Sequence, residues 1–204
     1  MLDRAMRKLI DPPLNVVGRH LAGRGVSANS VTLIGLVFGL IAAALIALEH
    51  YLPGLIFILA SRLADGLDGA VARAGRKSDF GGYLDIASDF AFYGAVPLGF
   101  ILADPIANAV SGSFLLFAFY VNGASFLGYA ILAEKKGMQT KAQGVKSLYY
   151  SNGILEGTET IALFVILCLL PTMFSPLALG FGLLCLMTAG LRVYGAYRAF
   201  AINE

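Results

Sequence analysis

Long apolar segments alternate with short polar ones along most of this 204-residue chain. The apolar segments cover residues 30–48, 53–73, 80–103, 106–133, 148–170 and 177–199. Each is long enough for a helix that crosses the hydrocarbon layer of a bilayer, which takes roughly 20 residues. The pattern therefore predicts an all-α membrane protein with six transmembrane helices.

The first 26 residues follow another pattern, in which basic and apolar side chains are mixed and Pro12 and Pro13 interrupt the sequence. A basic face opposite an apolar face is typical of helices that lie on a membrane surface. We expect residues 1–26 to form short amphipathic helices next to the membrane and residues 27–204 to form the six-helix domain. A mobile basic tail is the alternative.

The positions of the charges predict the topology. The sequence contains 15 Lys and Arg residues, and all except Arg62 fall in the N-terminal segment, in the loops after the second and fourth apolar segments, or at the C-terminal end. Because Lys and Arg concentrate in cytoplasmic loops, both termini are expected in the cytoplasm. The net charge of +2 is too small to indicate a nucleic-acid partner.

Four aspartates interrupt the second and third apolar segments. Asp65 and Asp68 are three residues apart, and Asp85 and Asp89 are four apart, so each pair occupies one face of a helix. Carboxylates inside a membrane are costly and usually mark a functional site. Because hard divalent cations prefer oxygen ligands, the two pairs predict a site for one or two such ions.

Other charged residues are predicted at the same depth. Counting 1.5 Å per residue from the cytoplasmic ends of the helices places Arg62, Glu156 and Glu159 level with the aspartates. This layer indicates a cavity that opens to the cytoplasm. Arg62 could contact a substrate or pair with an acid, and the two glutamates could line an acceptor pocket or pair with Arg62. A network of buried ion pairs, or an ion path of a cation- or proton-coupled transporter, would be the alternative role of the acids.

The aspartates lie in a motif that resembles the signature of the CDP-alcohol phosphotransferase family, D-x2-D-G-x2-A-R followed by G-x3-D-x3-D. The matching residues are Asp65, Asp68, Gly69, Ala72, Arg73, Gly81, Asp85 and Asp89. The stretch from Ser27 to Thr32 is similar to the family's P-N-x-x-T element, with Ala28 in place of the proline.

The resemblance implies a phosphatidyltransferase of phospholipid synthesis that moves a substituted phosphate from a CDP-linked donor, expected to be CDP-diacylglycerol, to a small alcohol and releases CMP. A soluble CDP-alcohol donor with a lipid acceptor would be the alternative pair. It also implies that the four aspartates bind two Mg²⁺ or Mn²⁺ ions and that Asp89 is the general base. The residues implied for nucleotide binding are Thr32, Gly69, Ala72, Arg73 and Gly81.

Gly35 and Gly39 form a pair of small residues one helical turn apart in the first apolar segment. Such pairs let two membrane helices approach closely. We expect a homodimer in which small residues of this kind form the interface.

Overall fold

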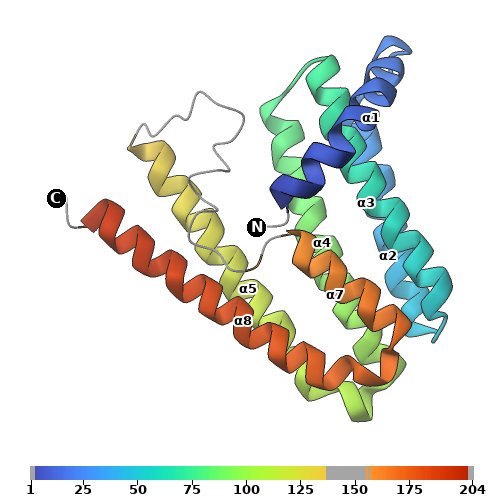
Figure 1. The fold of residues 1–204 in the computed structure, drawn as a ribbon, viewed down its shortest axis with the longest axis vertical. Helices are drawn as coiled ribbons and strands as arrows, with labels where there is room; N and C mark the ends of the chain where they lie inside the picture. The colour runs from blue at the N-terminus through green and yellow to red at the C-terminus, as the bar shows by residue number, and fades with distance from the viewer. Residues whose placement is uncertain (1–2, 137–154, 156, 202–204) are drawn as a thin grey trace.

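The computed structural model describes residues 3–136, 155 and 157–201, and this part of the chain is helical throughout, without a β-strand (Figure 1). The long helices are α1 (Asp3–Gly23), α2 (Ala28–Ala47), α3 (Tyr51–Ala74), α4 (Asp79–Ala103), α5 (Pro105–Lys135), α7 (Gly157–Leu169) and α8 (Phe174–Ala196). A 3₁₀ turn, η1 (Pro171–Met173), precedes α8, and a π-helical segment, η2 (Tyr197–Ala201), follows it.

Four helices are long and apolar enough to cross a membrane: α2, α4, α5, and the stretch from Pro171 to Phe200. Large apolar side chains such as Ile106 and Val110 point outward, with 101% and 84% of their surface exposed. An outward-facing apolar surface is what lipid requires. These features confirm an all-helical membrane protein, whereas six spans and cytoplasmic termini remain predictions because α3 carries several charges and the described part of α7 is short.

The helices begin where side chains satisfy the first backbone N–H groups. Ser27 accepts a hydrogen bond from Ser30 N at 3.1 Å, and Ser78 accepts one from Gly81 N at 3.0 Å. Asp104 does the same for Ala107 N at 3.0 Å, directly before α5. Such N-caps typically stabilise a helix by about 1 kcal/mol each. The starts of these three helices lie within a few residues of the predicted ones.

The expectation that the proline pair would divide the N-terminal segment is wrong, because α1 continues through Pro12 and Pro13 as one helix. Both prolines are exposed, whereas Leu14 and Gly18 are buried on the other side. A Cβ atom on Gly18 would come within 2.7 Å of Ala70, and one on Gly66 would meet Leu14 Cδ1 at 2.7 Å. This close contact with α3 supports the helix although prolines remove backbone hydrogen bonds.

Helix α2 is the centre of the first half of the protein, and both α3 and α4 pack along it rather than along each other. A Cβ atom on Gly35 would lie 3.2 Å from Ala64 of α3, and one on Gly39 would lie 2.7 Å from Phe92 of α4. The prediction that these glycines face a second copy of the chain is therefore wrong, because neighbouring helices of the same chain already cover them. The homodimer itself stays a prediction.

Helices α5 and α8 form a second group, in which α5 runs beside α8, whereas α7 packs mainly against α3 (Figure 1). An aromatic core connects the two groups. Phe92 and Phe164 make an edge-to-face contact with ring centres 5.8 Å apart, and Phe100 stacks on Phe174 at 5.1 Å. All four rings are buried, so they fix the part of α4 that lies directly after Asp89.

Candidate metal centre

Three carboxylates meet between α3 and α4. One oxygen from each of Asp65, Asp68 and Asp85 lies within 4.8 Å of the other two. Asp68 precedes the end of α3 by six residues and Asp85 follows the start of α4 by six, so the short connection at 75–78 brings them to the same level. Since both helices rest on α2, their acidic faces meet across a space that α2 closes from behind.

Thr32 of α2 reaches into this group from behind. Its hydroxyl lies 2.6 Å from Asp68 Oδ2 and donates a hydrogen bond to it, and both side chains are buried. The same oxygen lies 3.0 Å from the carbonyl of Ala28, one turn earlier in the helix. Thr32, which the family motif associates with the nucleotide, thus orients one carboxylate of the cluster.

Asp89 occupies a different position from the other three acids. Among the described residues, the group with the 4.8 Å spacing does not include it. Its Oδ1 instead accepts a hydrogen bond of 2.8 Å from Arg62 Nη1, and the same nitrogen lies 3.7 Å from Asp65 Oδ1. Arg62 therefore bridges the space from α3 to α4 and pairs with an acid, one of the two roles that the sequence left open for it.

The guanidinium of Arg62 lies over the aromatic core. Its central carbon is 3.8 Å from the centre of the Phe92 ring, a distance typical of cation–π contacts. Arg62 Nη2 also donates to Ser61 Oγ at 3.2 Å, and Ser61 Oγ in turn donates to the carbonyl of Gly35 at 2.7 Å. These contacts connect the ion pair to both α2 and α4.

The other predicted nucleotide-binding residues lie near the end of α3 and the start of α4, on either side of the connection at 75–78. Gly69, Ala72 and Gly81 are partly exposed. A Cβ atom on Gly81 would lie 2.9 Å from Asn29 Oδ1, so a glycine at this position allows the first turn of α4 to lie close to α2. Arg73 is exposed, and its Nε and Nη2 donate to Asn15 Oδ1 of α1 at 3.2 and 3.0 Å.

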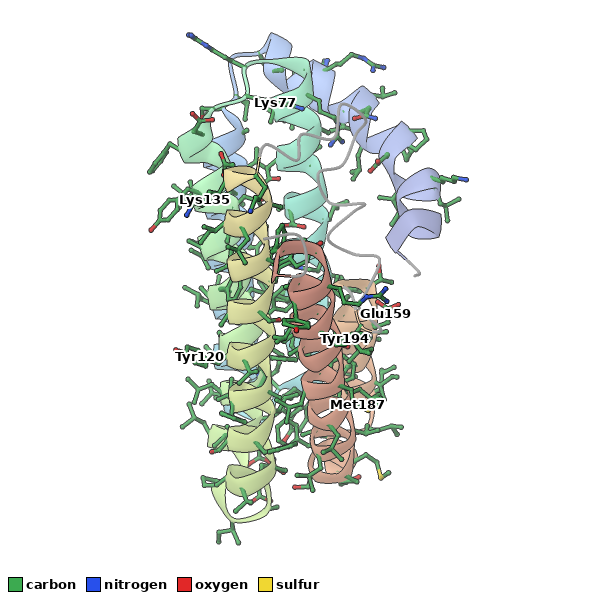
Figure 2. All side chains as sticks on the ribbon, turned by 90° about the vertical axis from the view of Figure 1, so that its left-hand side faces the viewer. Lys77, Tyr120, Lys135, Glu159, Met187 and Tyr194 are labelled. Carbon is green, nitrogen blue, oxygen red and sulfur yellow. The ribbon has the colours of Figure 1, made fainter. Side chains whose placement is uncertain are left out.

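Of the two glutamates predicted at the depth of the aspartates, the structure describes only Glu159. Glu156 lies outside the described residues. Glu159 is half-buried at the start of α7, at about the level of Tyr194 (Figure 2). Among the described residues it is not part of the carboxylate group. Its acceptor-binding role stays a prediction.

Sequence reasoning missed some polar residues of the structure. Asn15 and Ser61 gave no signal beyond being polar in apolar surroundings. Arg192 of α8 is only 4% exposed, and its Nη1 lies 2.9 Å from Asn122 Oδ1 and 2.7 Å from Ser125 Oγ of α5. A charge within an apolar helix could have identified Arg192, since such residues rarely face lipid.

The donor set fits a hard divalent cation. The three converging side chains of Asp65, Asp68 and Asp85 offer only carboxylate oxygens, which suit Mg²⁺ or Mn²⁺ better than metals that favour nitrogen or sulfur. Arg62 contacts Asp65 and Asp89, as the alternative of an ion-pair network predicts, whereas Arg73 donates a hydrogen bond to Asn15 of α1. Several carboxylates in one small space repel each other unless cations join them.

Comparison with known proteins agrees with the motif. A family model described as CDP-alcohol phosphatidyltransferase matches residues 26–193. The inner membrane protein YnjF of Escherichia coli is 48% identical over 197 residues, which cover 97% of this chain and 96% of that protein. An archaetidylinositol phosphate synthase of Pyrococcus horikoshii is 36% identical over 85 residues, 41% of this chain and 45% of that one.

The fold also matches a solved enzyme. The crystal structure of the phosphatidylinositol phosphate synthase of Mycobacterium tuberculosis with CDP-DAG bound has a TM-score of 0.64 at 21% identity, covering 90% of this chain and 93% of that chain. A second structure of that enzyme, in complex with manganese and citrate, has the same TM-score at 20% identity and covers 90% of this chain and 88% of that one. At this level of identity the comparison establishes a shared fold.

Proposed function

Because the chain belongs to the CDP-alcohol phosphatidyltransferase family, we propose that it moves a phosphatidyl group from CDP-diacylglycerol to the hydroxyl of a small polar alcohol and releases CMP. The observation that carries this proposal is the convergence of Asp65, Asp68 and Asp85 beside Asp89 in a membrane-embedded bundle. Membership of a transferase family also favours this function over the alternative of a transporter.

The proposed reaction is a single phosphoryl-group transfer. Asp89 accepts the proton of the acceptor hydroxyl, the hydroxyl oxygen bonds to the phosphorus of the phosphatidyl group, and the bond from that phosphorus to the oxygen of CMP breaks. A carboxylate within hydrogen-bond reach makes an alcohol a better nucleophile. When bound, divalent ions would neutralise the charge on the pyrophosphate oxygens.

The chain's own residues divide the remaining work in this proposal. Asp65, Asp68 and Asp85, with Asp89 beside them, would hold two Mg²⁺ or Mn²⁺ ions, and the complex of a fold relative with manganese supports Mn²⁺. Thr32 would keep Asp68 oriented, as its 2.6 Å hydrogen bond suggests. Gly69, Ala72, Arg73 and Gly81 would receive the nucleotide at the cytoplasmic end of the site.

The membrane arrangement belongs to the same proposal. Six spans with both termini in the cytoplasm would open the site to the cytoplasm of a prokaryotic cell, where the soluble acceptor and CMP are. The bound CDP-DAG of the fold relative supports a lipid donor that enters from the bilayer. One relative is an archaetidylinositol phosphate synthase and another is a phosphatidylinositol phosphate synthase, which makes a phosphorylated polyol the first acceptor to test. Glu156, Glu159 and Arg62 stay the acceptor-pocket candidates, and the protein would act as a homodimer.

A panel of substrates tests the proposal directly. Purified protein in lipid nanodiscs would be offered CDP-diacylglycerol or soluble CDP-alcohols, each with Mn²⁺ or Mg²⁺ and a set of acceptors that includes inositol phosphate, glycerol phosphate, serine and diacylglycerol. We expect CMP release coupled to a new phospholipid with CDP-diacylglycerol and one water-soluble acceptor. Transfer from a soluble donor to diacylglycerol would establish the alternative pair.

The matched control is Asp68→Asn, which keeps the shape of the side chain and removes its charge. We expect this variant to release no CMP above background with the substrate pair that works for the wild type. If the folded wild type releases no CMP from any donor, the proposed function is wrong.

A further inference from the structure

We propose that Arg62 is a positioning residue that acts as a fixed cation inside the site: it holds Asp89 apart from Asp65, Asp68 and Asp85 and weakens the binding of divalent ions by these acids. The inference rests on the proposed function and assigns Arg62 a role in setting how strongly the site takes up its ions.

The first step is that Arg62 is held firmly in place. Its side chain is 12% exposed and its guanidinium lies over Phe92, a ring that is completely buried in the aromatic core. The hydrogen bond to Ser61 Oγ fixes a second edge of the group. A guanidinium that is stacked and bonded in this way cannot leave without exposing part of the core, so it remains near the acids.

The second step concerns which oxygens Arg62 occupies. A single nitrogen, Nη1, lies 2.8 Å from Asp89 Oδ1 and 3.7 Å from Asp65 Oδ1. The guanidinium therefore lies between the acid of α3 and the acid of α4 that are farther from the connection at 75–78. A metal ion that approached Asp89 Oδ1 would compete with this contact. Asp89 is therefore directed toward an acceptor hydroxyl through its other oxygen, while the cation site falls mainly to the remaining three acids.

The third step is electrostatic. A positive charge a few Å from a divalent ion repels it strongly in a partly dry site, where the effective dielectric constant is far below that of water. The hydrogen bond from Thr32 to Asp68 does not involve Arg62, so Asp68 should stay oriented when the charge of Arg62 is removed. Removing the charge of Arg62 should consequently strengthen ion binding while it releases Asp89.

The test measures Mn²⁺ binding by electron paramagnetic resonance on the full-length purified protein, together with the rate of CMP release. We expect Arg62→Met to bind Mn²⁺ at least about tenfold more tightly and to lose at least about tenfold in turnover. Arg62→Lys keeps the charge and should stay within about threefold of the wild-type Mn²⁺ affinity, with reduced turnover because lysine cannot bridge Asp89 and Ser61 as a planar guanidinium does.

In Arg62→Met, the Mn²⁺ affinity should rise while the turnover falls. This combination identifies Arg62 as a positioning residue, since a damaged structure would lower both quantities. Arg198→Met, an exposed arginine of η2, is the matched control and should leave both within about twofold of the wild type. Size-exclusion profiles show whether each variant is folded. If Arg62→Met does not fold, the same measurements are made on Arg62→Gln.

Unchanged or weaker Mn²⁺ binding in the folded neutral variant would overturn the proposal. That result differs from failure of the proposed function, in which the wild type would release no CMP from any donor whatever its affinity for Mn²⁺.

Discussion

Two buried arginines show how differently two parts of the molecule use the same side chain. Arg62 lies between acids of α3 and α4, where Asp89 accepts its closest hydrogen bond at 2.8 Å. Arg192 lies between α8 and α5, where the carbonyl of Asn122, its side-chain oxygen and Ser125 Oγ lie 3.0, 2.9 and 2.7 Å from Nη1. The first arginine belongs to a cluster of carboxylates, and the second joins two helices through neutral oxygens.

The difference matters because a buried charge is costly unless its partners compensate for it. Arg192 donates hydrogen bonds to neutral oxygens of α5, and these bonds strengthen the contact between α8 and α5. Around Arg62 lie several acids, and the divalent ions of the proposed function would balance their charge. Ion binding should therefore respond to changes in the α3–α4 region and not to changes at the α5–α8 contact.

The largest effect is expected from Asp89→Asn. The amide can still accept the hydrogen bond of Arg62 but cannot take up a proton from the acceptor alcohol. We expect the rate of CMP release to fall by roughly 10²- to 10⁴-fold while the protein still folds and binds Mn²⁺. Initial rates at saturating substrate measure the loss. Activity near the wild-type level would remove Asp89 from the role of base.

A smaller effect should follow Thr32→Val, which keeps the volume of the side chain and removes the hydroxyl that binds Asp68 Oδ2. Groups that orient a metal ligand typically contribute about 10- to 100-fold to metal affinity. We expect Mn²⁺ binding to weaken by about tenfold in an equilibrium titration. Ser30→Ala is the matched control, since Ser30 lies on the same helix but bonds to Ser27 on the exposed side. Equal losses in both variants would show that the effect comes from α2 as a whole.

The smallest effect on ion binding is expected from Arg192→Met. Loss of the hydrogen bonds to α5 leaves partly buried oxygens of Asn122 and Ser125 without this donor, which should reduce the free energy of unfolding by about 1–3 kcal/mol. Detergent-induced unfolding monitored by circular dichroism measures this change. Mn²⁺ affinity should stay within about twofold, and a large shift would show that the two regions are coupled.

The fold was largely predictable because its signals are local. The predicted apolar segments place the ends of α2, α3, α4, α5 and α8 within a few residues of those observed. The spacing of the aspartates was equally informative, since three- and four-residue intervals put each pair on one face of its helix. The motif then connected these faces to a family, and the family model matching residues 26–193 confirmed the connection.

Contacts that depend on how helices are rotated against each other were not predictable. Sequence spacing could not show that Arg62 reaches Asp89 across 27 positions or that Thr32 meets Asp68 across 36. The glycine pair of α2 correctly indicated a close approach, but a spacing pattern does not name the partner helix. The proline pair misled for a similar reason, because support of α1 by α3 is a tertiary contact.

The contact of α1 with α3 also limits how freely the sequence can vary. Gly66 and Ala70 face α1 through Leu14 and Gly18, while the acids on either side of Gly66 face α4. Each turn of α3 in this stretch is thus constrained from two directions, one by shape and one by charge.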